Sequence, residues 1–411
     1  MKIIQLADIN PSPDVPVACR KHIDYIDTAS VVEGRLCCVQ RLAGAFPSRA
    51  QREIRANDIL ISSVRPNLRH NYFVSQNENC MIASSGFIHI RVNNPEKVSP
   101  QFLYYFLTSP TQVQRYVKIA DSSQSAYPSF NKDVIEGLEF PDLPLPTQLR
   151  IAGVLGSIDE KIELNRKKIA ELEALAKTIY DYWFVQFDFP DKNGNPYKSS
   201  GGKMVWKEQL KREVPEGWKV GKLSNICTIS TSQCNPARFT QDTVEHYSIP
   251  AFDAGVFPAF DAPQSILSNK FRVVKTSILY SKLNAQFKRI WDPLHITDNP
   301  IASSEFVVYV PKNALHRGYL YAVLNGEQFF AFANSISSCS TGSRKRFTPE
   351  TTYHFSVILP HNAIVKEFSR QYSALLDSMR IARLEIDFLT KQRDFLLPLL
   401  MNGQISAREL K

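Results

Sequence analysis

The chain has 411 residues, too many for a single domain of typical size of about 150 residues, so we expect two or three domains. Lys and Arg number 49 against 40 Asp and Glu, and the resulting net charge of +9 suits contact with a polyanion without requiring it. The composition, 44% hydrophobic and 22% charged, excludes a chain that is mainly disordered. No apolar run approaches the roughly 18 residues of a membrane span, and the first ten residues resemble neither a signal nor a transit peptide, so we expect a cytoplasmic protein.

Residues 1–145 are predicted to form a mixed unit of strands and helices. The short apolar runs at 58–64 and 87–92 are typical of buried strands, and residues 101–107 have the spacing of an amphipathic helix. The mixture indicates the α+β class.

Residues 146–186 are predicted to form one long helix. Ten positions from Ile151 to Trp183, only one of them polar, recur in alternating steps of four and three residues. A 3.5-residue period sustained over this length is the seam of a coiled coil rather than the face of an ordinary amphipathic helix.

The rest of the chain repeats this order. Residues 187–217 are polar and contain several Pro and Gly, which predicts a linker. Residues 218–360 again carry strand-like runs and a helical patch, and residues 361–411 again carry a heptad series, from Phe368 to Leu400. We therefore expect a second mixed unit followed by a second long helix.

An internal repeat connects the two halves. Residues 58–62 resemble residues 277–281, at a separation of 219 positions. Residues 83–88 resemble residues 302–307 at the same separation, and the ten seam positions of the two heptad series are all 217 positions apart. The repeat predicts two mixed α/β units and two helices related by a pseudo-two-fold axis.

The order of the elements predicts that the two helices pair as an antiparallel coiled coil. Each seam covers 33 residues, about 50 Å of helix, so the pair would hold the two units a fixed distance apart. Such a clamp suits a split DNA site, because equivalent groove faces of the duplex recur about every 34 Å. The predicted seam residues are Leu155, Ile158, Ile162, Ile169, Leu172, Ile179, Tyr372, Leu375, Met379, Ile386, Leu389 and Leu396.

Basic stretches occupy equivalent positions in the two units. Residues 270–289 contain six cations and no acid, and residues 51–70, which lie 219 positions earlier, are also rich in Arg. Arg and Lys suit guanine edges and phosphates, and Asn and Gln suit adenine, whereas the simpler alternative is a solvated charged surface. Polar loops at 121–127 and 338–346 form a second matched pair. We predict DNA contacts by Arg49, Arg52, Arg65, Asn67, Arg69, His70, Gln124, Ser125, Tyr127, Lys270, Lys282, Asn284, Gln286, Lys288, Arg289, Ser343, Arg344, Lys345 and Arg346.

Catalytic interpretations find less support. Gly201-Gly202-Lys203-Met204 lacks the Ser or Thr of a P-loop, and Asn195-Pro196-Tyr197 and Asn299-Pro300-Ile301 fail as the base-binding box of an adenine methyltransferase. Asp142 with Asp159-Glu160-Lys161 superficially fits a Mg²⁺-dependent nuclease, but the latter three residues are more simply the exposed face of a coiled coil. The seven cysteines form no Cys-X-X-Cys pair and the histidines have no ligand spacing. We expect no catalytic residue and no metal site.

Several segments resemble one protein family. Leu143-Pro144-Leu145-Pro146-Thr147-Gln148, leading into Ile158-Asp159-Glu160-Lys161-Ile162, resembles the central region of type I restriction-modification specificity subunits. In the second half Leu359-Pro360-His361-Asn362 stands where the first has the fuller Pro-Leu-Pro-Thr-Gln box. Further segments similar to the family are 182–190, 199–204, 215–218 and 396–403.

This resemblance implies that the two units are target recognition domains, each reading one half of a bipartite asymmetric DNA site, with the helices setting the spacer. It further implies that the helices dock two modification subunits, which bring S-adenosylmethionine, and that restriction subunits join for ATP-dependent cleavage with Mg²⁺. No cofactor is expected in this chain. The alternative is a non-catalytic coiled-coil scaffold without sequence-specific DNA binding.

Overall fold

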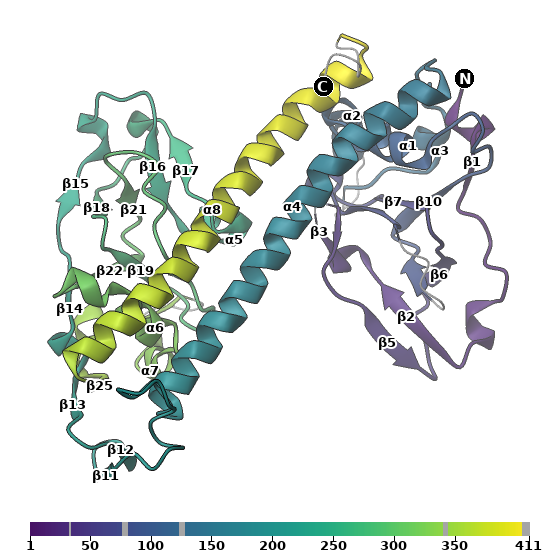
Figure 1. Cartoon of the computed structure of the whole chain (residues 1–411). Coiled ribbons are helices and arrows are strands. Elements are labelled where there is room, and N and C mark those ends of the chain that lie inside the picture. Colours follow the sequence, from purple (N-terminus) through teal and green to yellow (C-terminus); the bar gives the residue numbers. More distant parts are fainter. Residues whose placement is uncertain (33, 76–80, 123–127, 340–343, 405–411) are drawn as a thin grey trace. The chain divides into compact units, whose positions relative to one another are not determined.

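The computed structural model describes the whole chain except residues 33, 76–80, 123–127, 340–343 and 405–411. It divides into two compact units, which we call unit 1 (Met1–Ile162 with Phe388–Lys411) and unit 2 (Glu163–Asp387). Two long helices, α4 (Leu145–Tyr180) and α8 (Asn362–Met401), each contribute one segment to each unit (Figure 1). Each unit thus combines two helical segments with a head of strands and short helices.

The head of unit 1 contains two four-stranded sheets. Neighbouring strands of the first sheet are all antiparallel, whereas the central strands of the second sheet, β2 and β9, are parallel. The first sheet has the order β1 (Ala7–Ile9), β10 (Phe87–Val92), β7 (Ile59–Ser62), β8 (Asn71–Phe73). The second has the order β5 (Gln40–Ala43), β2 (His22–Ile26), β9 (Met81–Ser84), β6 (Ala50–Glu53), and β3 (Val31–Val32) pairs separately with β4 (Arg35–Leu36).

The head of unit 2 repeats both sheets. Its first sheet has the order β14 (Cys227–Ile229), β22 (Phe306–Pro311), β19 (Ile278–Ser281), β20 (Ile290–Trp291). Its second has the order β15 (Gln233–Cys234), β18 (Lys270–Arg272), β21 (Ile301–Ala302), β16 (Val244–Tyr247), β17 (Ala259–Asp261), with β16 and β21 parallel. Two-stranded ladders join β13 (Lys219–Lys222) to β25 (Ser356–Leu359) and β23 (Ser338–Cys339) to β24 (Lys345–Arg346). The recurring strand order confirms the predicted fold class and internal repeat.

Short helices connect the strands in both heads. Unit 1 has α1 (Pro100–Leu107), α2 (Pro110–Asp121) and α3 (Asp133–Glu136), and unit 2 has α5 (Ile249–Gly255), α6 (Arg317–Asn325) and α7 (Glu327–Ser335). A π-helical turn (Asp181–Val185) continues α4. Single 3₁₀ segments occur at Ile3–Gln5, Val17–Cys19, Thr28–Ser30, Pro66–Leu68, Leu223–Asn225, Pro236–Arg238, Pro263–Ser265, Ala314–His316 and Pro349–His354.

The long helices pair antiparallel in each unit, as predicted. In unit 2 the Asn165 amide donates to the Glu385 carboxylate at 2.9 Å, and further along α4 Glu173 pairs with Arg383 at 3.1 Å. As residue numbers rise along α4, the residues that they contact on α8 have falling numbers, so the two helices are antiparallel. In unit 1 Asp159 pairs with Arg393 at 2.9 Å and also accepts from the Tyr105 hydroxyl at 2.7 Å. Asp159 thus connects α4 to α8 and to α1 within unit 1.

The predicted seam is buried only in part. Leu155, Ile162, Tyr372 and Met379 are buried, whereas the other predicted seam residues are half-buried: Ile158, Ile169, Leu172, Ile179, Leu375, Ile386, Leu389 and Leu396. The neighbouring Leu376 and Leu397 are buried instead of Leu375 and Leu396. Each helix also covers a head, so its apolar face is wider than a strict 3.5-residue seam.

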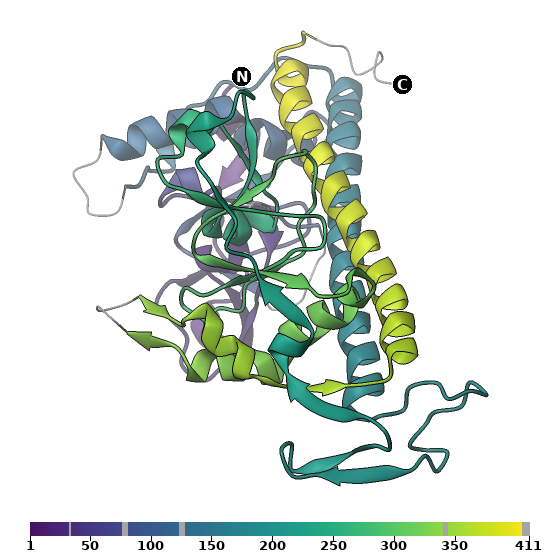
Figure 2. The same ribbon diagram turned by 90° about the vertical axis from the view of Figure 1, so that its left-hand side faces the viewer.

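The segment predicted as a linker is folded. It contains a hairpin of β11 (Met204–Lys207) and β12 (Arg212–Pro215), which projects beyond β13 and β25 in both views (Figures 1 and 2). Phe189 is buried and its ring stacks on those of Tyr197 and Trp218, with centroids 4.7 and 4.8 Å apart. Aromatic burial therefore anchors a segment that its Pro and Gly content marks as loose.

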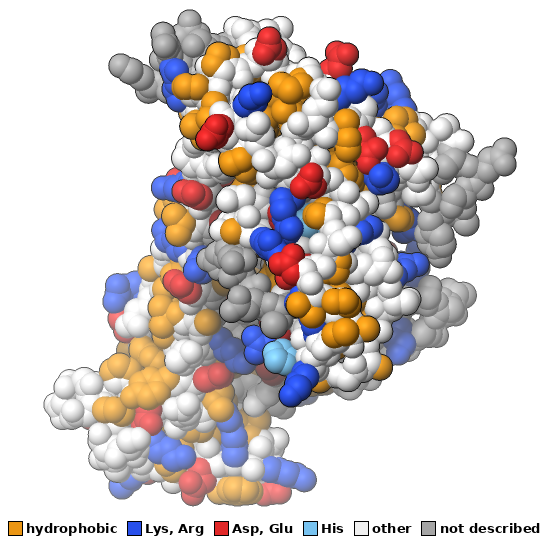
Figure 3. All heavy atoms as spheres, turned by 90° about the vertical axis from the view of Figure 1, so that its right-hand side faces the viewer, with side chains coloured by type: hydrophobic (Ala, Val, Ile, Leu, Met, Phe, Trp, Pro, Cys, Tyr) orange, Lys and Arg blue, Asp and Glu red, His pale blue; other side chains and the backbone are white. Residues whose placement is uncertain are grey.

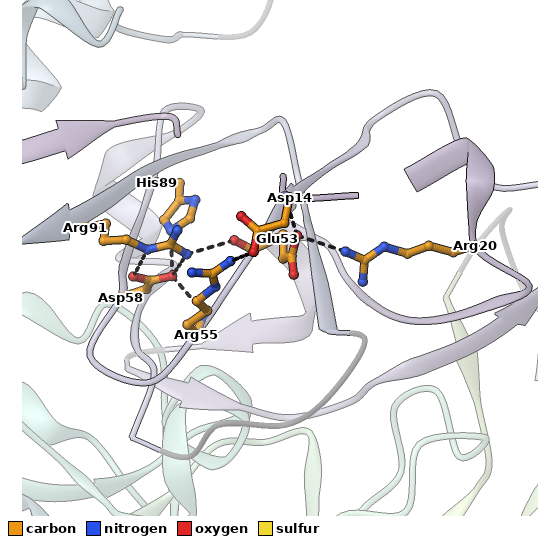
Figure 4. A network of polar contacts seen from close by, with 7 residues as sticks. All are labelled: Asp14, Arg20, Glu53, Arg55, Asp58, His89 and Arg91. Atoms are coloured by element: carbon orange, nitrogen blue, oxygen red, sulfur yellow. Dashed lines mark hydrogen bonds and ion pairs between the residues drawn. The ribbon is translucent and has the colours of Figure 1, made fainter. Parts of the chain in front are cut away.

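A buried charge network braces the first sheet of unit 1 (Figure 4). The Asp58 carboxylate is almost fully buried, accepts from Arg91 at 2.7 and 2.9 Å, and contacts His89 Nε2 at 2.8 Å. Burial alone would raise the pKa of Asp58, but the hydrogen bonds from His89 and Arg91 outweigh it, so the pKa lies below its usual value. The repeat places Ser277, Val308 and Val310 at the equivalent positions of unit 2, so only unit 1 uses charge here.

Replacing Asp58 by Ala should destabilise unit 1 by about 3 kcal/mol, because it leaves Arg91 and His89 without their buried partner. The matched change in unit 2, Ser277→Ala, should cost about 1 kcal/mol, since it removes only the acceptor for the Val274 amide. Hydrogen exchange resolved by unit gives both values.

Since the folded pKa of Asp58 is lowered, its contribution to the stability of unit 1 is complete above about pH 4 and is lost as the pH falls through the folded value. Equal acid sensitivity of wild type and Asp58→Ala in unit 1 would contradict this account.

Candidate nucleic-acid interface

Two loops of the same construction follow the equivalent strands β7 and β19. We call residues 65–70 loop A, in unit 1, and residues 284–289 loop B, in unit 2. Each begins with a residue in the left-handed region, Arg65 with φ 48° and Asn284 with φ 51°, and these positions are 219 apart. The next turn closes in the same way: the Leu68 amide donates to the Arg65 carbonyl and the Phe287 amide to the Asn284 carbonyl, both at 2.9 Å.

The first residue of each loop forms a backbone hydrogen bond with a segment that comes later in the same head. The Arg65 amide donates to the Pro128 carbonyl at 2.9 Å, and the Asn284 amide donates to the Lys345 carbonyl at 2.8 Å. The Asn284 side chain also accepts from the Lys345 amide at 3.1 Å. Lys345 of the second predicted polar loop therefore lies beside loop B, and Pro128, directly after the first predicted polar loop, lies beside loop A. Gln124, Ser125, Tyr127 and Ser343 lie outside the described residues.

Loop A presents most of its predicted contacts to solvent. Arg65, Asn67 and Arg69 are exposed, while His70 is half-buried and burial lowers its pKa. Nearby in the sequence Arg49 is exposed and Arg52 is half-buried on β6. The exposed members can reach phosphates or base edges, but a largely neutral His70 adds little charge at pH 7.

Loop B holds its cations with acids from other parts of unit 2. Arg289 pairs with both carboxylate oxygens of Asp253 at 2.7 and 2.8 Å, and Lys288 pairs with Glu327 at 3.2 Å. The bidentate geometry fixes the guanidinium more firmly than a single contact would. Sequence reasoning missed these acids because they lie 36 and 39 residues away from their cations.

The remaining predicted residues of unit 2 divide into exposed and half-buried groups. Gln286, Arg344 and Lys345 are exposed. Arg346 and Lys282 are half-buried, and Arg346 pairs with Glu305 at 2.7 Å; its hydrogen bond holds the pKa of that carboxyl below the usual value.

Lys270 does not lie on the surface, contrary to the prediction that it contacts DNA. It is only 8% exposed, on β18, and its ammonium donates to the Ser268 carbonyl at 3.1 Å and to the Ser268 hydroxyl at 2.7 Å. Burial also lowers its pKa. Its place in the sheet gives Lys270 a structural contact, and the structure offers no exposed ammonium there for a DNA phosphate.

Charged side chains are dispersed over the one face that Figure 3 draws. On the face drawn in Figure 3, Lys and Arg side chains lie singly or in small groups among acidic and hydrophobic ones.

Within the described residues no group of three or more His, Cys, Asp or Glu is placed to hold a metal ion. The described helices include none that is long and apolar enough to span a membrane.

Comparisons with known proteins agree on one class. The family described as type I restriction modification DNA specificity domain matches residues 25–174. The type I restriction enzyme HindI specificity subunit of Haemophilus influenzae is 23% identical, over 93% of this chain and 94% of the relative. The MjaIX specificity subunit of Methanocaldococcus jannaschii is 22% identical, over 82% of this chain and 76% of the relative.

A solved structure shares the fold along the chain. The type I restriction-modification system S subunit from M. genitalium has a TM-score of 0.56 at 15% identity, covering 97% of this chain and 95% of that one. The repeated heads, the paired helices and these relatives define a DNA-specificity class of protein. Residues 25–174 match the DNA specificity domain of type I restriction-modification systems, and most of the chain is similar to the specificity subunits of such systems.

Replacing Asn284 by Ala should loosen loop B, because Ala has no acceptor for the Lys345 amide and disfavours a φ of 51°. We expect the Lys345 and Phe287 amides to exchange with solvent about tenfold faster, as measured by hydrogen exchange. Asn284→Gly is the control: it tolerates the backbone conformation, so only the Lys345 amide should exchange faster. Unchanged exchange of the Phe287 amide in both variants would show that the left-handed residue does not support the turn.

Proposed function

We propose that loops A and B form part of the surfaces with which the two heads of this specificity subunit read the halves of a bipartite asymmetric DNA site. The observation that carries this proposal is the recurrence of one loop construction, with the same left-handed residue and the same closing hydrogen bond, in both heads. A repeated reading element is what a two-part site requires.

The side chains of the two loops fit two tasks. The exposed cations Arg65, Arg69, Arg344 and Lys345 suit phosphates, which orient a protein on the duplex and make its affinity depend on salt. Asn67 and Gln286 are exposed and suit adenine edges. Arg289, held by Asp253, is pre-oriented for a directional contact with a guanine edge rather than for a mobile phosphate contact.

Specificity subunits are generally non-catalytic, and we propose that the chemistry resides in partner subunits. Two modification subunits would dock on the long helices and bring S-adenosylmethionine, and restriction subunits would add ATP- and Mg²⁺-dependent cleavage. The chain's own Asp159, the acid best placed in the sequence for a nuclease, is paired with Arg393, which supports this assignment. Two modification subunits suit the internal repeat, since each repeat would offer one docking segment.

Replacing both Arg65 and Arg69 by Ala should weaken DNA binding by the complex with modification subunits about tenfold or more at physiological salt. The slope of log affinity against log salt should fall by about two, one for each lost phosphate contact. Lys97→Ala, which removes an exposed cation of unit 1 outside loop A, is the control and should keep the wild-type slope or lose less than one unit of it. Unchanged DNA affinity together with impaired partner binding would favour the scaffold alternative.

We also propose that the long helices set the spacer between the two half-sites. Inserting seven residues into α4 and seven at the paired position of α8 preserves the heptad register and adds about 10 Å of helix. The methylated sites should then have a spacer longer by about three base pairs, as read by mapping methylated adenines. An unchanged spacer would show that the helix length does not determine it.

A further inference from the structure

Loops A and B each expose one large apolar side chain at the same position. Leu68 is 44% exposed and Phe287 is 55% exposed, and the two positions are 219 apart. The amide of each donates to the carbonyl of the left-handed residue three positions earlier. A single exposed apolar residue is ordinary on a protein surface, but its recurrence at one backbone site of two divergent heads calls for a shared role.

The side chain of Phe287 is held in place. The Arg289 guanidinium lies over its ring, 5.1 Å from the centroid, and Asp253 grips that guanidinium through two hydrogen bonds. The backbone beneath is fixed by the reciprocal hydrogen bonds between Asn284 and Lys345. The ring therefore loses little conformational entropy on contact with a partner, which favours a directed apolar contact.

The backbone beneath Leu68 is also fixed. The Arg69 amide donates to the Pro66 carbonyl at 3.1 Å, Pro66 is buried, and Val64 forms a β-bridge with Ser129. Leu68 thus stands on a supported turn between the exposed side chains of Asn67 and Arg69. In the sequence, both apolar residues are flanked by a cation and an amide, the groups that suit base edges in the major groove.

We propose that Leu68 and Phe287 are specificity-determining residues, each of which contacts the C5-methyl group of a thymine in its own half-site. This inference rests on the proposed function of the two loops. Thymine presents its methyl group in the major groove, where an apolar side chain can recognise it and an unmethylated pyrimidine gives no such contact. The apolar contact complements the charged groups beside it, because it carries base preference without a phosphate contact.

Uracil in place of thymine tests the contact, because it removes only the methyl group. Each thymine of the two half-sites is replaced in turn, and binding by the complex with modification subunits is measured. For the wild type, one replacement in each half-site should weaken binding about fourfold. Phe287→Ala should abolish the effect in one half-site, and Leu68→Ala should abolish it in the other, with the salt dependence of both variants unchanged.

Two variants serve as matched controls. Leu315→Ala and Val15→Ala remove apolar side chains that are 57% and 49% exposed but lie outside the loops, in units 2 and 1. Both should keep the wild-type response to uracil. Circular dichroism and assembly with modification subunits establish that each variant folds.

The inference is overturned if no thymine responds to uracil, or if the loop variants respond as the wild type does. It is also overturned if 2-aminopurine placed in a half-site brightens on wild-type binding but not on binding of Phe287→Ala, since that would indicate a side chain wedged between base steps. Failure of the proposed function has a different signature: the wild-type complex itself would bind the half-sites no better than unrelated DNA.

Discussion

The core of unit 1 is completed by the last helix of the chain. Leu397 and Leu400 of α8 are buried in the same cluster as Ile151 and Leu155 of α4 and as residues of α1 and the first sheet. Each such side chain contributes about 1.5–3 kcal/mol when it leaves water. The first head therefore lacks part of its core until the end of the chain has been made. Residues from both repeats therefore share the core of unit 1.

The core of unit 2 likewise depends on residues from both long helical segments. Trp183 and Phe184, in the π-helical turn that continues α4, pack against Phe368 of α8, with ring centroids 5.4 and 4.8 Å apart. The helices are thus structural members of both heads rather than rods attached to them. That arrangement explains why a strict coiled-coil seam describes their burial poorly: Leu376 and Leu397 face a head as well as a helix.

The two heads share a backbone plan but use charge differently. Unit 1 buries Asp58 with His89 and Arg91 inside its first sheet, where unit 2 has an apolar cluster that includes Val308. In loop A Asn67 and Arg69 are exposed, and in loop B Lys288 and Arg289 pair with acids. One frame with different side chains is what two domains need in order to read different half-sites.

The sequence predicted the repeat and the matched positions of the two loops, because a constant separation of 219 survives divergence of the side chains. It predicted the antiparallel helices from the order of the elements and from seam positions that are 217 apart. It could not place Lys270 inside the sheet or reveal that Asp253 grips Arg289, because such contacts depend on how distant segments pack. It also predicted no structure for residues 187–217, where the stacking of Phe189 on Trp218 outweighs the Pro and Gly content. The apolar residues Leu68 and Phe287 could have been found by aligning the repeat and looking for apolar positions within its polar stretches.

Photo-crosslinking tests the central claim, that each head reads its own half-site through its loop, most directly. A photoreactive amino acid is placed at Asn67 or at Gln286, both exposed, and the complex with modification subunits is bound to DNA that carries its methylation site. The account predicts crosslinks from position 67 to one half-site and from position 286 to the other, with none from the exposed position 370 on α8. Crosslinks from both loops to the same half-site, or to DNA regardless of its sequence, would contradict it.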